Sequence, residues 1–346
     1  MEVADDQVES GPLNGVSRQH SWREVGVELG PAGKKRDLKR AGKLLRAAGV
    51  TPSSMRTELD RAFGLTSNGQ ESGVEPGTVG ELVGAYLAAQ CDLLASNDVG
   101  LRTGAPVVHE TRVAARRLRS TLRVFNDVVD AAPAEELNNE LAWYADLLGE
   151  VRDREVLSAR LTALIDDLPP EQVRGPVEAE ITKTLATERD DATQRLNEEM
   201  SSSRYEHLMT LLRAWKTVPP LNHAAAAKDR TAARYVKKAN RKADRRLRNA
   251  DGDIDQLHRA RRAMKRVRNA AELVEPADSK MKAIERDAKK LQTLLGEHQD
   301  AIVAADFLAA LSVTSENGNE DSGFTYGVLM ANELHRAAAI RESLRG

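Results

Sequence analysis

The sequence VVHETRVAARRLR occupies residues 107–119, and a related sequence, QLHRARRAMKRVR, occupies residues 256–268. The third residue of each is a histidine, and Arg or Lys follows that histidine three, seven, eight and ten positions later. His109 and His258 are 149 residues apart. Because a repeat at a fixed spacing is typical of duplicated architectures, the pair indicates that one structural unit occurs twice in this chain.

A second motif repeats downstream of the first. LLGEVRD at residues 147–153 matches LLGEHQD at residues 294–300, and the two glycines are 147 residues apart. Two motifs that recur in the same order at nearly the same offset predict a duplicated helical region. We expect Asp153 and Asp300 either to cap helices that begin after a Leu-Gly turn or to form ion pairs with arginines of the first motif.

Two stripes follow each copy of the first motif at helical spacing. Apolar positions, such as Leu118 and Leu122 in the first copy and Met264 and Val267 in the second, recur every three or four residues and predict a core-facing stripe. A cationic stripe lies one position further along, about 100° around the helix. It contains no carboxylate, which favours a polyanion site over a solvated helix face. Its members are His109, Arg112, Arg116, Arg119 and Arg123, then His258, Arg261, Lys265 and Arg268.

Composition predicts an all-α fold. Aromatic residues make up only 3% of the chain, whereas straight-chain helix formers are plentiful. The net charge is −2, but Lys228–Arg268 holds 16 Lys and Arg against 5 Asp and Glu. The periodicity predicts helices near 78–96, 106–130, 134–148, 153–167, 172–215, 224–250, 253–274, 278–295, 299–313 and 323–344.

The first 77 residues differ from the rest in composition. We expect residues 1–20 to be disordered, residues 22–29 to form a strand because they alternate, and residues 34–48 and 53–63 to form short helices. A polar linker is predicted at residues 66–77. A lone strand needs a partner for its backbone groups, and the sequence does not identify one.

Several function classes lack support in the sequence. Cys91 is the single cysteine, so no internal disulfide or CxxC metal site is expected, and the sequence leads us to expect neither a signal peptide nor a spanning segment. We therefore expect a soluble cytoplasmic protein without metal or cofactor. No P-loop, nucleophile elbow or paired nucleophile and base is present, which predicts a non-enzyme. The absence of interleaved aromatics argues against nucleic acid.

The two motifs together resemble the CHAD (conserved histidine α-helical domain) family over residues 78–346, with halves at about 78–218 and 219–346. The resemblance implies two four-helix bundles related by pseudo-two-fold symmetry. It also implies a basic groove or pore that binds inorganic polyphosphate, with no established catalysis, and a location on polyphosphate granules. The stripe residues are then the binding candidates, and Lys289 joins them as a Lys upstream of the second Leu-Gly motif. Asn269 departs from the family, many members of which have an aromatic residue there.

Further cations could extend this track or lie on a solvated face: Arg117, Arg266, Lys238, Arg241 and Arg245. Nucleic-acid binding stays an alternative for the same charges. Residues 21–65 resemble the C-terminal end of a CYTH (triphosphate tunnel) domain, but its ExExK metal motif is missing. A triphosphate or polyphosphate hydrolase is therefore a second alternative only if a functional CYTH part exists.

Overall fold

A computed structural model describes residues 2–10, 20–28, 35–50, 75–314 and 320–344. The chain consists of two compact units, residues 1–72 and residues 73–346, and each is described separately. The predicted helix at 53–63 and most of the predicted linker lie outside the described residues.

The N-terminal unit contains an antiparallel hairpin of β1 (Glu2–Ser10) and β2 (His20–Glu28), followed by α1 (Lys35–Ala47). The strand and first helix predicted here are confirmed. The prediction of disorder over residues 1–20 is wrong for residues 2–10. Strand β1 pairs along its whole length with β2, with Val3 opposite Val27 and Val8 opposite Trp22. The backbone groups of β2 are thus satisfied by β1, a partner strand that the polar sequence of residues 2–10 does not reveal.

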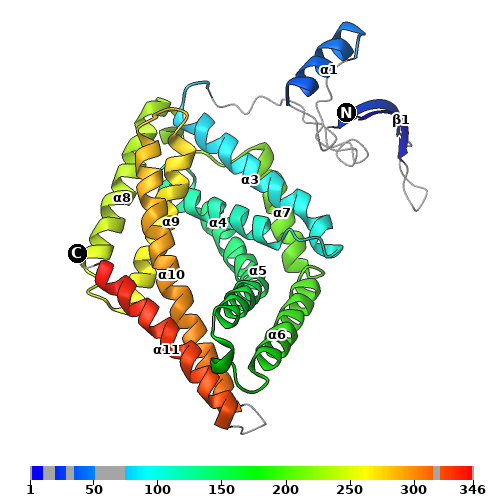
Figure 1. Ribbon diagram of the computed structural model, residues 1–346. Helices are drawn as coiled ribbons and strands as arrows, with labels where there is room; N and C mark the ends of the chain where they lie inside the picture. The colour runs from blue at the N-terminus through cyan, green and yellow to red at the C-terminus, as the bar shows by residue number, and fades with distance from the viewer. Residues whose placement is uncertain (1, 11–19, 29–34, 51–74, 315–319, 345–346) are drawn as a thin grey trace. The chain divides into compact units, whose positions relative to one another are not determined.

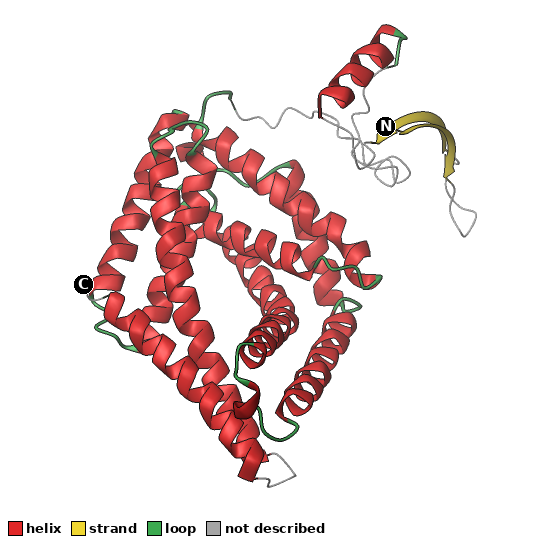
Figure 2. Ribbon diagram, in the orientation of Figure 1, coloured by secondary structure: helices red, strands yellow, loops and turns green. Residues whose placement is uncertain are grey.

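The second unit confirms the all-α class, as Figure 2 shows. Short loops and 3-10 turns join its helices. None of the described helices is long and apolar enough to span a membrane. The helices are α3 (Val79–Arg102), α4 (Val108–Val124), α5 (Ala131–Asp166), α6 (Val177–Glu199), α7 (Ser203–Thr217), α8 (Ala233–Arg248), α9 (Ile254–Val274), α10 (Met281–Thr314) and α11 (Glu320–Ser343).

Three of the predicted boundaries are wrong. Helix α5 is continuous where two helices, 134–148 and 153–167, were expected, and α10 likewise joins 278–295 to 299–313. Conversely, the single helix expected over 172–215 is divided into α6 and α7. Ser202 caps α7 by accepting a hydrogen bond from the Tyr205 amide, at 3.2 Å, which fixes a new helix start there.

The packing order repeats within this unit. Helix α4 packs between α3 and α5, and α6 packs on α5; in the same way, α9 packs between α8 and α10, and α11 packs on α10. Helix α7 packs on α3, and none of the described helices of the second repeat takes the equivalent place. Figure 1 shows α4 and α5 facing α9 and α10, and α4 also contacts α9 directly.

The largest apolar cluster and one smaller cluster combine residues of both repeats. Leu161 of α5 and Ile181 of α6 share an apolar cluster with Leu308 of α10 and Leu329 of α11. The predicted apolar stripes are confirmed, because Leu118, Leu122, Met264 and Val267 are all buried. The grouping into two four-helix bundles stays a prediction, as does the division into halves near residue 218.

Candidate polyanion-binding site

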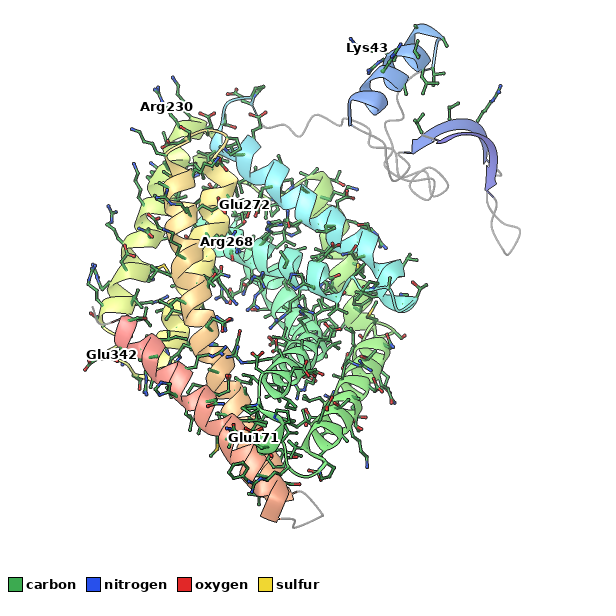
Figure 3. All side chains as sticks on the ribbon, viewed as in Figure 1. Lys43, Glu171, Arg230, Arg268, Glu272 and Glu342 are labelled. Atoms are coloured by element: carbon green, nitrogen blue, oxygen red, sulfur yellow. The ribbon has the colours of Figure 1, made fainter. Side chains whose placement is uncertain are left out.

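A pocket of about 620 Å³ lies between α4, α5, α9 and α10. Its volume is within the range of ordinary ligand sites. Figure 3 shows nitrogen-tipped side chains filling the space that these four helices surround. Nine Arg and Lys side chains and His258 line the pocket, against three aspartates. The cations are Arg112, Arg116, Arg119, Arg123, Arg160, Arg261, Arg262, Lys265 and Arg266, and the aspartates are Asp146, Asp153 and Asp300.

The two cationic stripes meet because α4 and α9 cross at equivalent positions of the repeat. The Asn269 side-chain amide donates a 3.0 Å hydrogen bond to Ser120 Oγ, and these two residues are 149 apart in sequence. Asn269 thus occupies its buried position with a polar partner across the helix contact. The crossing places Arg112 and Arg116 of α4 in the same pocket as Arg261 and Lys265 of α9.

The Leu-Gly-x-x-x-Asp motif positions one arginine in each repeat. Gly149 of α5 leaves room for Arg112, since a Cβ atom there would lie 3.3 Å from Arg112 Nη2. One turn later, Asp153 Oδ1 lies 3.1 Å from Arg112 Nη1. The glycine of the motif therefore leaves space for an arginine of the cationic stripe, and the aspartate forms an ion pair with it.

The second copy of the motif does the same in α10. A Cβ at Gly296 would lie 3.4 Å from Arg261 Nη2, and Asp300 Oδ1 lies 3.5 Å from that same nitrogen. Asp153 and Asp300 lie inside α5 and α10, so the helix-capping interpretation is wrong and the ion-pair alternative is confirmed. The glycine and the aspartate are one turn apart, so both face the arginine from one side of the helix.

Part of the predicted set lies outside the pocket. His109 is exposed at the start of α4, and Lys289 is exposed on α10. Arg268 Nη1 donates a 3.4 Å hydrogen bond to Gln292 and its Nε lies 3.8 Å from Glu285. Arg117 pairs with Glu272 at 2.7 Å. On α8, the side chains of Lys238, Arg241 and Arg245 are exposed and do not line the pocket.

Two lining cations were missed by sequence reasoning. Arg262 directly follows Arg261 and lies one turn before Arg266 on the same face of α9, a pattern that could have identified it. Arg160 comes from the second half of α5, outside both repeat motifs. Its Nε lies 2.6 Å from the fully buried Glu333 of α11, and its Nη1 lies 3.3 Å from Glu297 of α10.

Burial and mutual repulsion disfavour the charged forms of the cationic side chains in the pocket. Burial, followed by the charges of Arg261, Arg116 and Arg112, lowers the pKa of Lys265 to about 7. Burial and neighbouring arginines also lower the pKa of Arg116, to about 10, which leaves it charged at neutral pH. An anion in the pocket would relieve this repulsion, so the empty arrangement favours binding of negative charge.

The pKa values of His109 and His258 are both lowered. For His258 burial is the main cause, with Arg262, Arg261 and Lys265 adding to it, while a hydrogen bond with Gln299 acts in the opposite direction. That bond joins His258 Nδ1 to Gln299 Oε1 at 3.1 Å. For His109 burial again comes first, followed by Arg152. Among the described residues, no three His, Cys, Asp or Glu side chains are grouped as metal ligands.

Comparison with known proteins gives one family and several relatives. The model of the CHAD domain matches residues 85–309. Two curated Mycobacterium tuberculosis proteins, the uncharacterized proteins Rv2226 and MT2285, are each 31% identical over 96% of this chain. The chain spans 65% of the length of these relatives.

Two solved structures share the fold. PptA from Streptomyces chartreusis has a TM-score of 0.63 at 23% identity, covering 77% of this chain and 97% of its own. The CHAD domain from the plant Ricinus communis has a TM-score of 0.59 at 26% identity, covering 78% of this chain and 92% of its own. These similarities concern the helical unit, and the CYTH-like interpretation of residues 21–65 stays a prediction.

Proposed function

The chain belongs to the CHAD domain family, and from that premise we propose that it binds inorganic polyphosphate in the pocket between α4, α5, α9 and α10. The observation that carries the proposal is the convergence of two repeated stripes on one pocket. Nine basic side chains face three carboxylates there, so the basic groups of the lining outnumber the acidic ones by six. The binding role of each candidate side chain is part of this proposal.

The chemistry of the lining suits a phosphate chain. The planar guanidinium of arginine donates two hydrogen bonds to one phosphate, and eight of the nine cations are arginines. Two of these, Arg112 and Arg261, are oriented by Asp153 and Asp300. The pocket lining includes no Phe, Tyr or Trp, so it lacks the large aromatic side chains on which successive nucleobases usually stack in single-strand-binding sites.

We propose further that the pocket binds without catalysis. Ser120 is the one hydroxyl among the lining residues, and it donates to the Arg116 carbonyl oxygen at 2.8 Å while accepting from Asn269. Among the described residues, no hydrogen bond joins this hydroxyl to a base that could activate it. A phosphate-release assay with Mg²⁺ or Mn²⁺ is expected to give no turnover on polyphosphate or triphosphate. Turnover would instead support the hydrolase alternative.

The central test removes four lining cations at once. We expect Arg112→Ala, Arg116→Ala, Arg261→Ala and Lys265→Ala together to weaken polyphosphate binding by about 100-fold or more, because several charge-assisted contacts are lost. The matched control replaces three arginines and one lysine that are exposed and outside the pocket. Its substitutions are Arg189→Ala, Arg213→Ala, Arg286→Ala and Lys290→Ala.

The control variant carries the same change in net charge, so it is expected to bind within a few-fold of the wild type. Circular dichroism of both variants checks that the helices are retained. Equal losses in the two variants would mean that net charge, and not the pocket, determines binding. A fluorescent fusion of the same two variants tests the expected location on polyphosphate granules, which only the pocket variant should lose.

Nucleic acid is the competing ligand for the same charges. Both ligands depend on salt through counterion release, so they must be compared at matched ionic strength. We expect duplex DNA and single-stranded RNA, at equal phosphate concentration, to displace little bound polyphosphate. Efficient displacement would favour the nucleic-acid alternative.

A further inference from the structure

The two copies of the repeat differ in charge at several positions, and one of these differences, Arg123 against Glu272, lies near the helix crossing. Arg117 and Arg123 of α4 correspond, 149 residues later, to Arg266 and Glu272 of α9. Three of these four positions are arginine and one is glutamate. The two copies therefore cannot make the same contact.

The helix crossing turns this difference into geometry. Ser120 and Asn269, which are equivalent, hydrogen-bond at the crossing. On one side of it, Arg117 Nη2 lies 2.7 Å from Glu272 Oε1, and neither residue lines the pocket. The repeat-related positions on the other side are Arg266 and Arg123, and both line the pocket. The Arg117–Glu272 ion pair thus lies on one side of the crossing, whereas the two cations Arg123 and Arg266 lie at the equivalent place on the other side.

The side chains near Arg123 and Arg266 are mostly cations, with few carboxylates among them. Arg119 and Arg262 line the same part of the pocket, and the Nε of Arg119 is buried without a hydrogen-bond partner. Among the described residues, no carboxylate lies within 4.0 Å of Arg123 or Arg266. Asp146 is the acidic lining residue that acts on Arg119.

The charge of this group is also not offset from outside the pocket. Burial, together with the charges of Arg123 and of Arg246 from α8, lowers the pKa of Arg266 to about 10. A pKa of about 10 leaves Arg266 charged at neutral pH, and the like charges around it repel it. Such a group is stabilised when an anion lies between its members.

We propose that Arg119, Arg123, Arg262 and Arg266 form a one-sided extension of the pocket that binds the outer phosphates of a long polyphosphate chain. The inference rests on the proposed function. The inner phosphates would lie at Arg112, Arg116, Arg261 and Lys265. Since the Arg117–Glu272 ion pair takes the equivalent place on the other side, the chain extends from the centre in one direction. The extension then discriminates long chains from short ones.

The substitution Arg123→Glu tests the extension, because a glutamate opposite Arg266 recreates the ion pair found between Arg117 and Glu272. Long-chain polyphosphate is expected to bind about tenfold more weakly, the loss of one charge-assisted contact. Tripolyphosphate, which the central residues can hold alone, should lose clearly less affinity, by about threefold or less. Arg213→Glu on α7 is the matched control, since it is exposed and carries the same charge change.

The outcomes separate the pocket extension from the proposed binding of polyphosphate. Equal effects on the two ligands, or no effect of Arg123→Glu on long chains, would overturn the extension and leave the proposed function standing. If the wild type binds neither ligand, the proposed function itself is wrong. Arg266→Gln is a second variant that removes the opposite cation without adding a carboxylate, and it should show the same dependence on chain length.

Discussion

At the scale of single residues, Lys265 is where binding and stability conflict. Its amine is surrounded by Arg261, Arg116 and Arg112, and burial adds to their effect, so the charged form is disfavoured in the folded protein. Buried charges of one sign destabilise a fold, and active or binding sites often carry this cost. The folded structure therefore holds a charge that the free protein would be more stable without.

Lys265→Met is expected to stabilise the protein while it weakens binding. Methionine has a similar length and no charge, so the free energy of unfolding at pH 7 should rise by about 1–3 kcal/mol. The pKa of Lys265 is about 7 when folded against 10.5 for a free lysine, so the unfolded state binds more protons between these values. Wild-type stability from this group rises with pH across that window. Urea unfolding should show a smaller gap at pH 9.5 than at pH 7, and a gap that is absent at both would contradict the burial of the charge.

Polyphosphate affinity should increase as the pH falls through 7. A bound polyanion raises the lowered pKa values of Lys265 and His258, so binding takes up protons. Titrations at pH 6, 7 and 8.5 with a long chain measure this, since few of its phosphates are terminal groups that titrate. Lys265→Arg, which keeps its charge, should flatten the curve above pH 7. A wild-type affinity that is constant over this range would show that neither group is coupled to the ligand.

At the scale of helices, Gly149 and Gly296 explain why two boundary predictions were wrong. A glycine lowers helix propensity, and a Leu-Gly motif followed by aspartate is typical of a helix end and a new cap. In α5 and α10 the helix continues, because the glycine is needed where Arg112 or Arg261 lies against the backbone. No single-chain pattern distinguishes a glycine that ends a helix from one that makes room for a neighbouring helix.

The double variant Gly149→Ala, Gly296→Ala tests this role. Alanine favours the helix by up to about 1 kcal/mol per site, so thermal stability should stay equal or rise. Its methyl groups would lie 3.3 and 3.4 Å from the two guanidinium groups, which must then shift by a few tenths of an ångström. Polyphosphate affinity should fall by roughly three- to tenfold. Unchanged affinity would mean that polyphosphate binding does not depend on the exact positions of these two arginines.

Much of the helical unit was predictable because periodicity and repetition are local signals. The apolar stripes are buried as expected, and four of the five cations predicted on α4 beyond its first turn line the pocket. His109 and Arg268 were predicted by symmetry, whereas the pocket is asymmetric and includes His258 but not His109. Arg160 could not be found, because its place depends on Glu297 and Glu333 from distant helices.

At the scale of the whole molecule, the duplication produces one site from two stripes. Neither α4 nor α9 alone encloses an anion; their crossing, with α5 and α10 behind them, brings the cations together. The contact is also held by Arg117–Glu272 and by Ser120–Asn269, each of which joins the two repeats. Substitutions in either repeat are therefore expected to affect the same binding event.

The most direct measurement of this claim is the stoichiometry of short polyphosphate binding by isothermal titration calorimetry. We predict one site per chain, and we expect Arg112→Ala with Arg116→Ala to abolish it as fully as Arg261→Ala with Lys265→Ala does. Two equal sites per chain, each lost with the substitutions in only one repeat, would contradict a shared pocket.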